Sequence, residues 1–174
     1  MISYLKLNRT ILYEGASFPL FVEFDYDADW ANLKVSVKFP SDSSLNKIFK
    51  GNTLAYITFD YLSSEENMQI VSFRNYLSLY DKEWDKEIHS KIPKYMFQYG
   101  KGFGRLILCL GIQYIVDNTE SKTGVLYLEA AEKGLIPYYE SFGFKLLRHH
   151  SYAMEADLAS IYSHCKVAKF YNKE

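Results

Sequence analysis

The sequence is poor in cysteine, and this scarcity limits the classes of protein to which it can belong. Only two cysteines, Cys109 and Cys165, occur among 174 residues. They are too few and too far apart for a disulfide framework or a thiolate metal site. Such usage fits a reducing compartment, so we expect an intracellular, cytoplasmic protein without a bound metal.

Long apolar runs and an excess of one charge are also missing. No stretch approaches the ~20 apolar residues of a membrane span, and the first residues lack a cationic lead before an apolar core. We therefore expect neither membrane insertion nor secretion. Lys and Arg number 20 against 21 Asp and Glu, a net charge of −1, so we expect no broad attraction to nucleic acid or to anionic lipid.

The chain is long and apolar enough for one domain with a sizeable core. Hydrophobic residues make up 48% of it, and no internal repeat or Pro/Ser-rich linker marks a boundary. We expect a single domain over residues 1–174. In its first half, four segments rich in β-branched and aromatic residues alternate with period two and predict strands. These are Pro19–Phe24, Leu33–Phe39, Thr53–Asp60 and Met68–Leu79.

The segment from Glu83 to Ile92, "EWDKEIHSKI", fits two periods. Trp84, Ile88 and Ile92 recur at spacing four, as on a helix, while the residues at alternate positions are polar, as on a strand. We favour a strand that ends near Pro93, because proline cannot donate to a continuing ladder.

The second half alternates helical and extended patterns. Gly104–Asn118 is too long an apolar run for an ordinary strand and predicts a buried helix. A buried strand over Gly124–Ala131 follows, then a short helix over Ile136–Phe142 that ends at Gly143. Two more strands, Phe144–Arg148 and Ser151–Leu158, complete an α+β layout around a mixed sheet.

Three glycines precede the long helix in "YGKGFGR", Tyr99–Arg105. The stretch matches neither the dinucleotide fingerprint nor the Walker loop. Residues without a Cβ let the chain turn tightly so that consecutive N–H groups face one point, and the helix N-terminus adds partial positive charge there. The loop therefore suits a pyrophosphate, although a purely structural turn is an equal alternative.

A second motif lies about thirty residues downstream, where "YLEAAEKGLIPYYESFGFKLL" spans Tyr127–Leu147. With the glycine loop, it resembles the GCN5-related N-acetyltransferase (GNAT) family, in which a pyrophosphate loop opens a helix, and a strand and a short helix ending in "Y-E-x-x-G-F" follow. Here that signature is Tyr139–Phe144. The first loop position, usually Gln or Arg in the family, is Tyr99. The resemblance covers about Glu87–Leu158.

The resemblance implies a mostly antiparallel mixed sheet flanked by helices, with acyl-CoA bound where two central strands splay apart. Residues 1–85 would be the variable N-terminal part, 86–158 the acetyl-CoA-binding core and 159–174 a C-terminal extension. The implied reaction is acetyl transfer from acetyl-CoA to a primary amine, on a small molecule or a protein, by direct attack in a ternary complex. A homodimer is compatible with the resemblance. The alternative is a CoA-binding module without catalysis, with a sensor or assembly role.

The resemblance also assigns roles to residues. The cofactor loop would be Tyr99, Gly100, Lys101, Gly102, Phe103, Gly104 and Arg105. Tyr139 matches the family's proton donor to the leaving thiolate, and is otherwise a core tyrosine. The family often places a general base on the strand before the loop, which points to Glu87 or His89; both share one face if that segment is a strand.

Other residues that could carry chemistry have weaker support. Glu129, on the following strand, is a weaker candidate for the base. His149, His150 and His164 show no metal-ligand spacing and are expected on the surface. Cys109 lies among apolar residues of the long helix and is expected to be a small core residue rather than a nucleophile.

Overall fold

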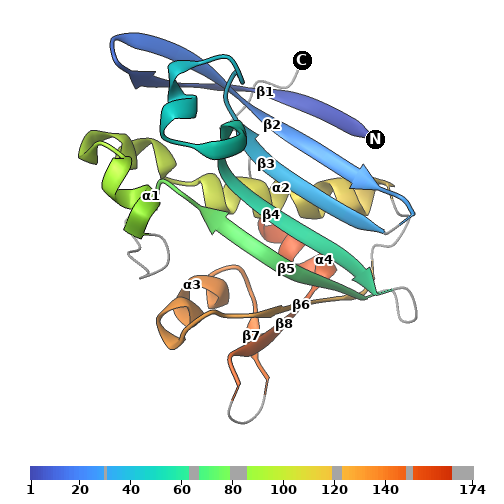
Figure 1. The fold of residues 1–174 in the computed structure, drawn as a ribbon. Coiled ribbons are helices and arrows are strands. Elements are labelled where there is room, and N and C mark those ends of the chain that lie inside the picture. Colours follow the sequence, from blue (N-terminus) through green and yellow to red (C-terminus); the bar gives the residue numbers. More distant parts are fainter. Residues whose placement is uncertain (30, 63–66, 79–85, 119–122, 148–150, 166–174) are drawn as a thin grey trace.

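A sheet of eight strands forms the centre of the computed structural model, which describes residues 1–29, 31–62, 67–78, 86–118, 123–147 and 151–165 (Figure 1). The spatial order is β1-β2-β3-β4-β5-β6-β8-β7. The strands are β1 (Ile2–Tyr13), β2 (Ala16–Asp27), β3 (Asn32–Lys38), β4 (Thr53–Leu62), β5 (Asn67–Asn75), β6 (Val125–Glu129), β7 (Lys145–Leu146) and β8 (Ala153–Asp157).

Strand directions divide the sheet into two parts. Strands β1 to β5 form an antiparallel meander, and β6, β8 and β7 form a second antiparallel group. The two parts meet where β5 runs parallel to β6, over only two residue pairs, Met68 with Leu126 and Gln69 with Tyr127. The expectation of a mixed, largely antiparallel α+β sheet is thus confirmed.

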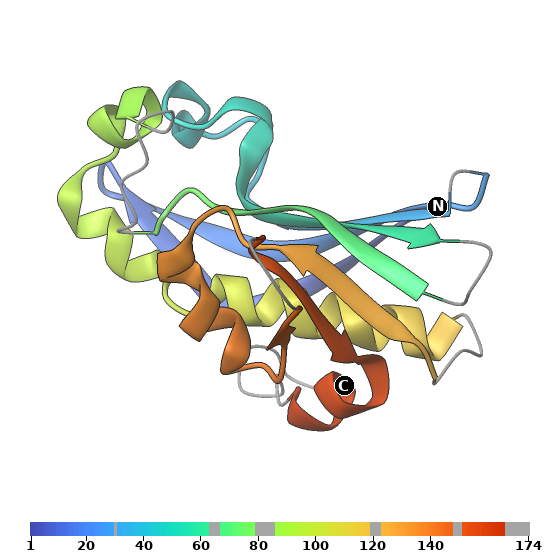
Figure 2. The same ribbon diagram turned by 90° about the horizontal axis from the view of Figure 1, so that it is seen from below.

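One long helix, α2 (Phe103–Asn118), covers one face of this sheet (Figure 2). Its contact with the strands is close, because a Cβ on Gly111 would collide with the ring of Phe59 on β4. The short helix α4 (Leu158–His164) packs on the other side of α2. Buried side chains of α2 and of strands β2 to β4 join in one core, as expected for a layer of helix on sheet.

Shorter helical segments connect these elements. The 3-10 segments η1 (Ser44–Lys47) and η2 (Lys50–Asn52) lie between β3 and β4, and helix α1 (Lys86–Lys91) and segment η4 (Lys94–Gly100) precede α2. After β6 come η5 (Lys133–Leu135) and α3 (Ile136–Glu140). The predicted stop at Gly143 is confirmed by its positive φ of 99°.

The predicted strand before Pro93 is wrong, because residues 86–91 form α1; Trp84 and Asp85 lie outside the described residues. Helix-stabilising contacts explain the outcome. Glu87 pairs with Lys91 one turn later at 3.2 Å, and the Ser90 hydroxyl donates to the Glu87 carbonyl at 2.8 Å. The spacing of four in the apolar pattern was therefore the informative period.

The prediction that the two cysteines are too far apart for a disulfide framework is corrected by the bond that they form. Cys109 is a buried residue of α2, as predicted, but its sulfur is bonded to that of Cys165, which directly follows α4; their Cα atoms are 5.1 Å apart. Packing of α4 on α2 brings together two residues that are 56 positions apart. The cytoplasmic location loses this support and stays a prediction. Among the described helices, none is long and apolar enough to cross a bilayer.

Candidate functional site

A cavity of about 680 Å³ opens where β5 and β6 diverge. The two strands are paired at their first residues and then separate, as Figure 1 shows. Beyond the last pair, Ile70–Asn75 of β5 and the three residues that follow it line one wall, and Leu128 and Glu129 of β6 line the other. The glycine loop and α3 close the end of the cavity.

Divergence leaves backbone polar groups along the walls. One edge of β5 stays paired with β4 as far as Asn75, while its other edge faces the cavity after Gln69. Backbone N–H and C=O groups on such an edge must find partners. An extended ligand that carries amide groups could pair with this edge in the manner of an added strand.

Two side chains from the sheet donate hydrogen bonds to carbonyls of the glycine loop. The Arg9 guanidinium, on β1, donates to the carbonyls of Tyr99 at 2.8 Å and Lys101 at 3.1 Å. The Asn75 amide donates to the carbonyl between them, that of Gly100, at 2.8 Å. Three consecutive carbonyls are thereby engaged by the protein, which fixes the conformation of the loop ahead of α2.

The first turn of α2 supplies N–H donors at this loop. The first intrahelical bond runs from the Leu106 N–H to the Gly102 carbonyl at 2.9 Å, so the N–H groups of the three preceding residues have no partner within the helix. Gly102 has a φ of 82°, a conformation that favours glycine. A Cβ on Gly100 would collide with the backbone of Leu77. The arrangement can hold an anion at the helix N-terminus.

Most of the predicted cofactor residues lie at this cavity. Five of them line it: Gly100, Lys101, Gly102, Gly104 and Arg105. Tyr99 and Phe103 are not among the lining residues. Phe103 is fully buried, and the Arg9 guanidinium lies 4.7 Å from its ring centre. The Phe103 ring therefore packs against the arginine that holds the loop.

Tyr139 lines the cavity from α3 and is buried, with 8% of its surface exposed. Its ring packs against Phe73 of β5 and Phe144, with both ring centres 6.1 Å away. Burial raises the pKa of Tyr139 to about 12, since the phenolate is poorly solvated there. The hydroxyl therefore keeps its proton throughout the neutral and moderately alkaline range.

Tyr138, its neighbour, also lines the cavity. A Cβ on Gly104 would lie 2.5 Å from the Tyr138 hydroxyl oxygen, so this hydroxyl stands directly at the first turn of α2. Burial and the adjacent Tyr139 raise the Tyr138 pKa, and Arg105 opposes them. Both tyrosines thus reach the cavity, at different places.

The two residues predicted as a base lie elsewhere. Glu87 and His89 are two positions apart on α1, so they point in nearly opposite directions instead of sharing a face. The Glu87 carboxylate pairs with Lys91, and the His89 ring packs edge-on against Phe97 at 5.6 Å. Neither is among the described residues that line the cavity.

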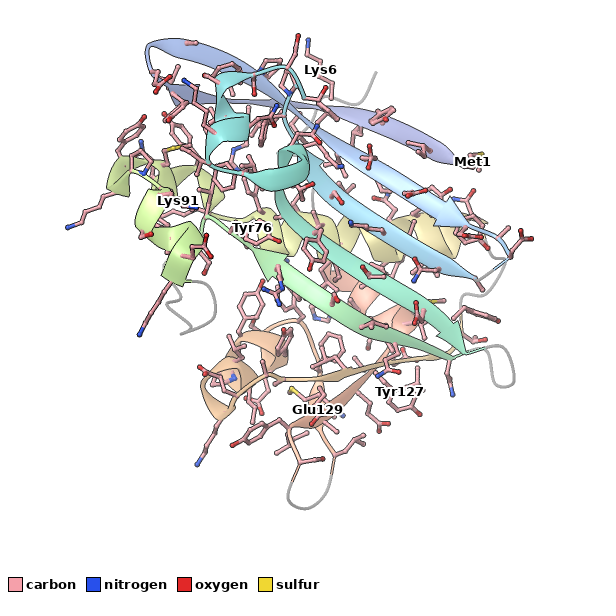
Figure 3. All side chains as sticks on the ribbon, viewed as in Figure 1. Met1, Lys6, Tyr76, Lys91, Tyr127 and Glu129 are labelled. Carbon is pink, nitrogen blue, oxygen red and sulfur yellow. A yellow bond between two sulfur atoms is a disulfide. The ribbon has the colours of Figure 1, made fainter. Side chains whose placement is uncertain are left out.

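Glu129, the weaker candidate for the base, does line the cavity. It is exposed at the end of β6, and it is the only Asp or Glu among the described lining residues. Figure 3 labels Glu129 on β6 and Tyr76 beside β5, on the two sides of the opening. Of the three residues predicted as a possible base, only Glu129 is therefore among the described lining residues.

His164, another of the candidates, is not among the described residues that line the cavity. His164 is exposed on α4, and its Nδ1 lies 2.7 Å from the Ser160 carbonyl; His149 and His150 lie outside the described residues. The described residues contain no group of three or more His, Cys, Asp or Glu side chains placed to hold a metal.

Sequence reasoning missed the residues that shape the site from a distance. Arg9 and Asn75 hold the loop from positions 90 and 25 residues away from their partners, and no local pattern marks either of them. Phe73 could have been suspected, because it belongs to a predicted strand. Its place beside Tyr139 depends on the sheet register.

Comparison with known proteins adds no family. No family model matches the chain, and no curated protein matches it significantly.

Proposed function

We propose that the protein transfers an acetyl group from acetyl-CoA to a primary amine. The observation that carries this proposal is the cavity between β5 and β6, which continues into the glycine loop at the start of α2. Acetyl-CoA has a matching shape, with a diphosphate at one end and an extended arm of two amides at the other. Few other common ligands combine an anion with a strand-like amide arm.

The residues at the cavity fit the parts of this ligand. The first N–H groups of α2, together with Lys101 and Arg105, would hold the diphosphate. The free edge of β5 would pair with the amide arm. The bound thioester is the group that the amine attacks.

Two side chains of this chain would manage the protons. Glu129 would take a proton from the attacking amine, which is mostly ammonium at neutral pH. Tyr139 would give its hydroxyl proton to the leaving sulfur. Its raised pKa keeps that proton in place at neutral pH, and its packing between Phe73 and Phe144 fixes the direction of the ring.

A CoA-binding module without catalysis is the competing proposal. One observation favours it: Glu87 and His89, on the segment where a base was expected, are in a helix and outside the cavity lining. The two proposals predict the same cofactor affinity. They differ in turnover, and in whether turnover depends on the Tyr139 hydroxyl.

The shared premise is tested by calorimetry with acetyl-CoA. Gly102→Val should abolish binding, because a β-branched residue resists a φ of 82° and deforms the loop. Gly15→Val is the matched control: Gly15 has a φ of 77° in the turn between β1 and β2, far from the cavity lining. Unchanged affinity in a folded Gly102→Val protein would refute the loop assignment.

A further inference from the structure

A row of cationic and aromatic side chains leads across the sheet to the cavity. On β4, Ala55 and Ile57 are buried on the side of α2, so Tyr56 between them points to the opposite face. In the strand register Tyr56 lies directly opposite Arg74 of β5. The Lys34 ammonium, from β3, lies 5.0 Å from the Tyr56 ring centre.

The row reaches the cavity through β5. Arg74 and Tyr76 both line the cavity, and the Tyr76 ring centre is 6.2 Å from that of Tyr56. Two rings inclined at 50° therefore lie next to each other, with the Lys34 ammonium near one of them and Arg74 opposite Tyr56 in the register. We call Lys34, Tyr56, Arg74 and Tyr76 the acceptor row.

Among the described residues, the carboxylates of Glu23 and Asp60 on this face of the sheet have partners of their own. Lys34 has Asp25 of β2 as its cross-strand neighbour, yet its ammonium lies over Tyr56, and these two described residues form no ion pair. Glu23 pairs with Lys38 at 3.2 Å, and Asp60 accepts a hydrogen bond from Asn32. The Lys34 ammonium is thus directed toward β4, the strand next to β5.

The opposite wall of the cavity has the opposite charge. Glu129 of β6 stands across the opening from β5, which carries Arg74. A molecule that spans the opening would meet a carboxylate at one end and cations at the other. Arginine favours anionic oxygens in particular, since its planar fork can donate two parallel hydrogen bonds to a carboxylate or a phosphate.

We propose that the acceptor is a small amine whose flat apolar body carries an anionic group, a carboxylate or a phosphate, at the end away from the amine. Its amine would face Glu129, its body would lie on Tyr56 and Tyr76, and its anion would pair with Arg74 and Lys34. This inference deepens the proposed function and rests on it for the role of the amine. The anion site itself can be tested without turnover.

The first experiment measures binding to the cofactor-free protein by NMR titration, with 4-ethylbenzoate, 4-ethylphenyl phosphate and neutral 4-ethylphenol as probes. We expect an anionic probe to bind at least ~5-fold more tightly than the phenol, and Arg74→Gln and Lys34→Gln each to remove most of this difference. Lys6→Gln is the matched control, because it removes the same charge from an exposed position on β1 outside the lining residues (Figure 3). The tighter of the two anions identifies the group.

The second experiment compares kcat/KM for phenethylamine, 4-(2-aminoethyl)benzoate and 4-(2-aminoethyl)phenyl phosphate. An anionic amine should be preferred by ~10-fold or more, and Arg74→Gln should reduce the preference to near unity while Arg74→Lys retains part of it. If Arg74→Gln does not fold, Arg74→Lys and Lys34→Gln decide.

The two experiments fail in different ways. Equal kcat/KM for all three amines, or equal binding of all three probes, overturns the acceptor proposal and leaves acetyl transfer standing. Absence of acetyl-CoA binding overturns the proposed function, whereas the titration still decides whether an anion binds at the acceptor row.

Discussion

Single side chains at the cavity differ in whether their roles follow from local sequence. Tyr139 was singled out by its place in the signature, and in the fold it is buried and lies on the cavity wall. Glu129 ranked below Glu87 and His89, and its rank changes because it alone lies at the cavity. The role available to a single side chain therefore depends on whether the fold places it at the cavity.

Replacing Tyr139 with phenylalanine keeps the ring and its packing but removes the hydroxyl. We expect kcat for acetyl transfer to fall by ~100-fold or more, as for loss of general acid assistance, with acetyl-CoA affinity nearly intact. The free energy of unfolding should change by no more than about 1 kcal/mol. Tyr162→Phe, at an exposed tyrosine of α4, is the control. Full turnover in the Tyr139 variant would make this residue a packing element and favour the binding module.

Replacing Glu129 with glutamine removes the proposed base without changing the size of the side chain. We expect kcat/KM to fall by ~100-fold or more at neutral pH. Glu87→Gln and His89→Gln should leave the rate unchanged, because neither lines the cavity. A loss of rate in either α1 variant, with Glu129→Gln fully active, would reverse the assignment.

Secondary-structure elements place the loop by contacts between β1, β5 and the start of α2. Local glycine content predicted a tight turn before a helix, and α2 begins at Phe103, one residue before the predicted start at Gly104. The orientation of that turn comes from Arg9 and Asn75, which engage three carbonyls in succession. The conformation of the glycine loop thus depends on three elements.

Arg9→Gln tests this support. Loss of the hydrogen bonds to Tyr99 and Lys101 should loosen the loop and weaken acetyl-CoA binding by ~10-fold, equivalent to about 1.4 kcal/mol. The change is measured by calorimetry, with circular dichroism to show that the sheet persists. Lys6→Gln, on the same strand and exposed, should bind normally. Wild-type affinity in Arg9→Gln would mean that Asn75 holds the loop alone.

A disulfide bond links two helices of the molecule covalently. The Cys109–Cys165 disulfide joins α2, at the centre of the core, to the end of α4. Beside it, Arg105 at the cavity donates to the His164 carbonyl at 2.9 Å. The end of α4 is therefore attached to the same helix that opens the anion site.

Reduction of this disulfide should lower the stability of the entire domain. The bond encloses a segment with a sequence separation of 56, for which chain-entropy arguments give about 4 kcal/mol and typical measurements 2–4 kcal/mol. We expect urea unfolding of the wild type to shift by this amount on addition of dithiothreitol. Cys165→Ser should have the lower stability with and without reductant. Identical wild-type curves in both conditions would show that the bond adds no stability.

The sequence by itself determined those features whose causes lie within a few residues. Alternation predicted strands β3, β4 and β5, the long apolar run predicted α2, and Gly143 predicted the end of the helical turn after α3. Backbone geometry and side-chain period act locally, so these signals could be read directly. The tight turn of the glycine loop before α2 belongs to the same class.

Only the tertiary structure decided what depends on distant partners. The segment before Pro93 fitted both the helical and the strand period. It forms helix α1, which contains the Glu87–Lys91 ion pair. Three features depend on residues that are 56 or more positions apart in the sequence. They are the short pairing of β5 with β6 before the strands diverge, the hydrogen bonds from Arg9 to the loop, and the disulfide between Cys109 and Cys165. Such contacts follow from sheet order and helix packing, because burial of the common core brings distant segments together. No local pattern in either segment identifies its partner.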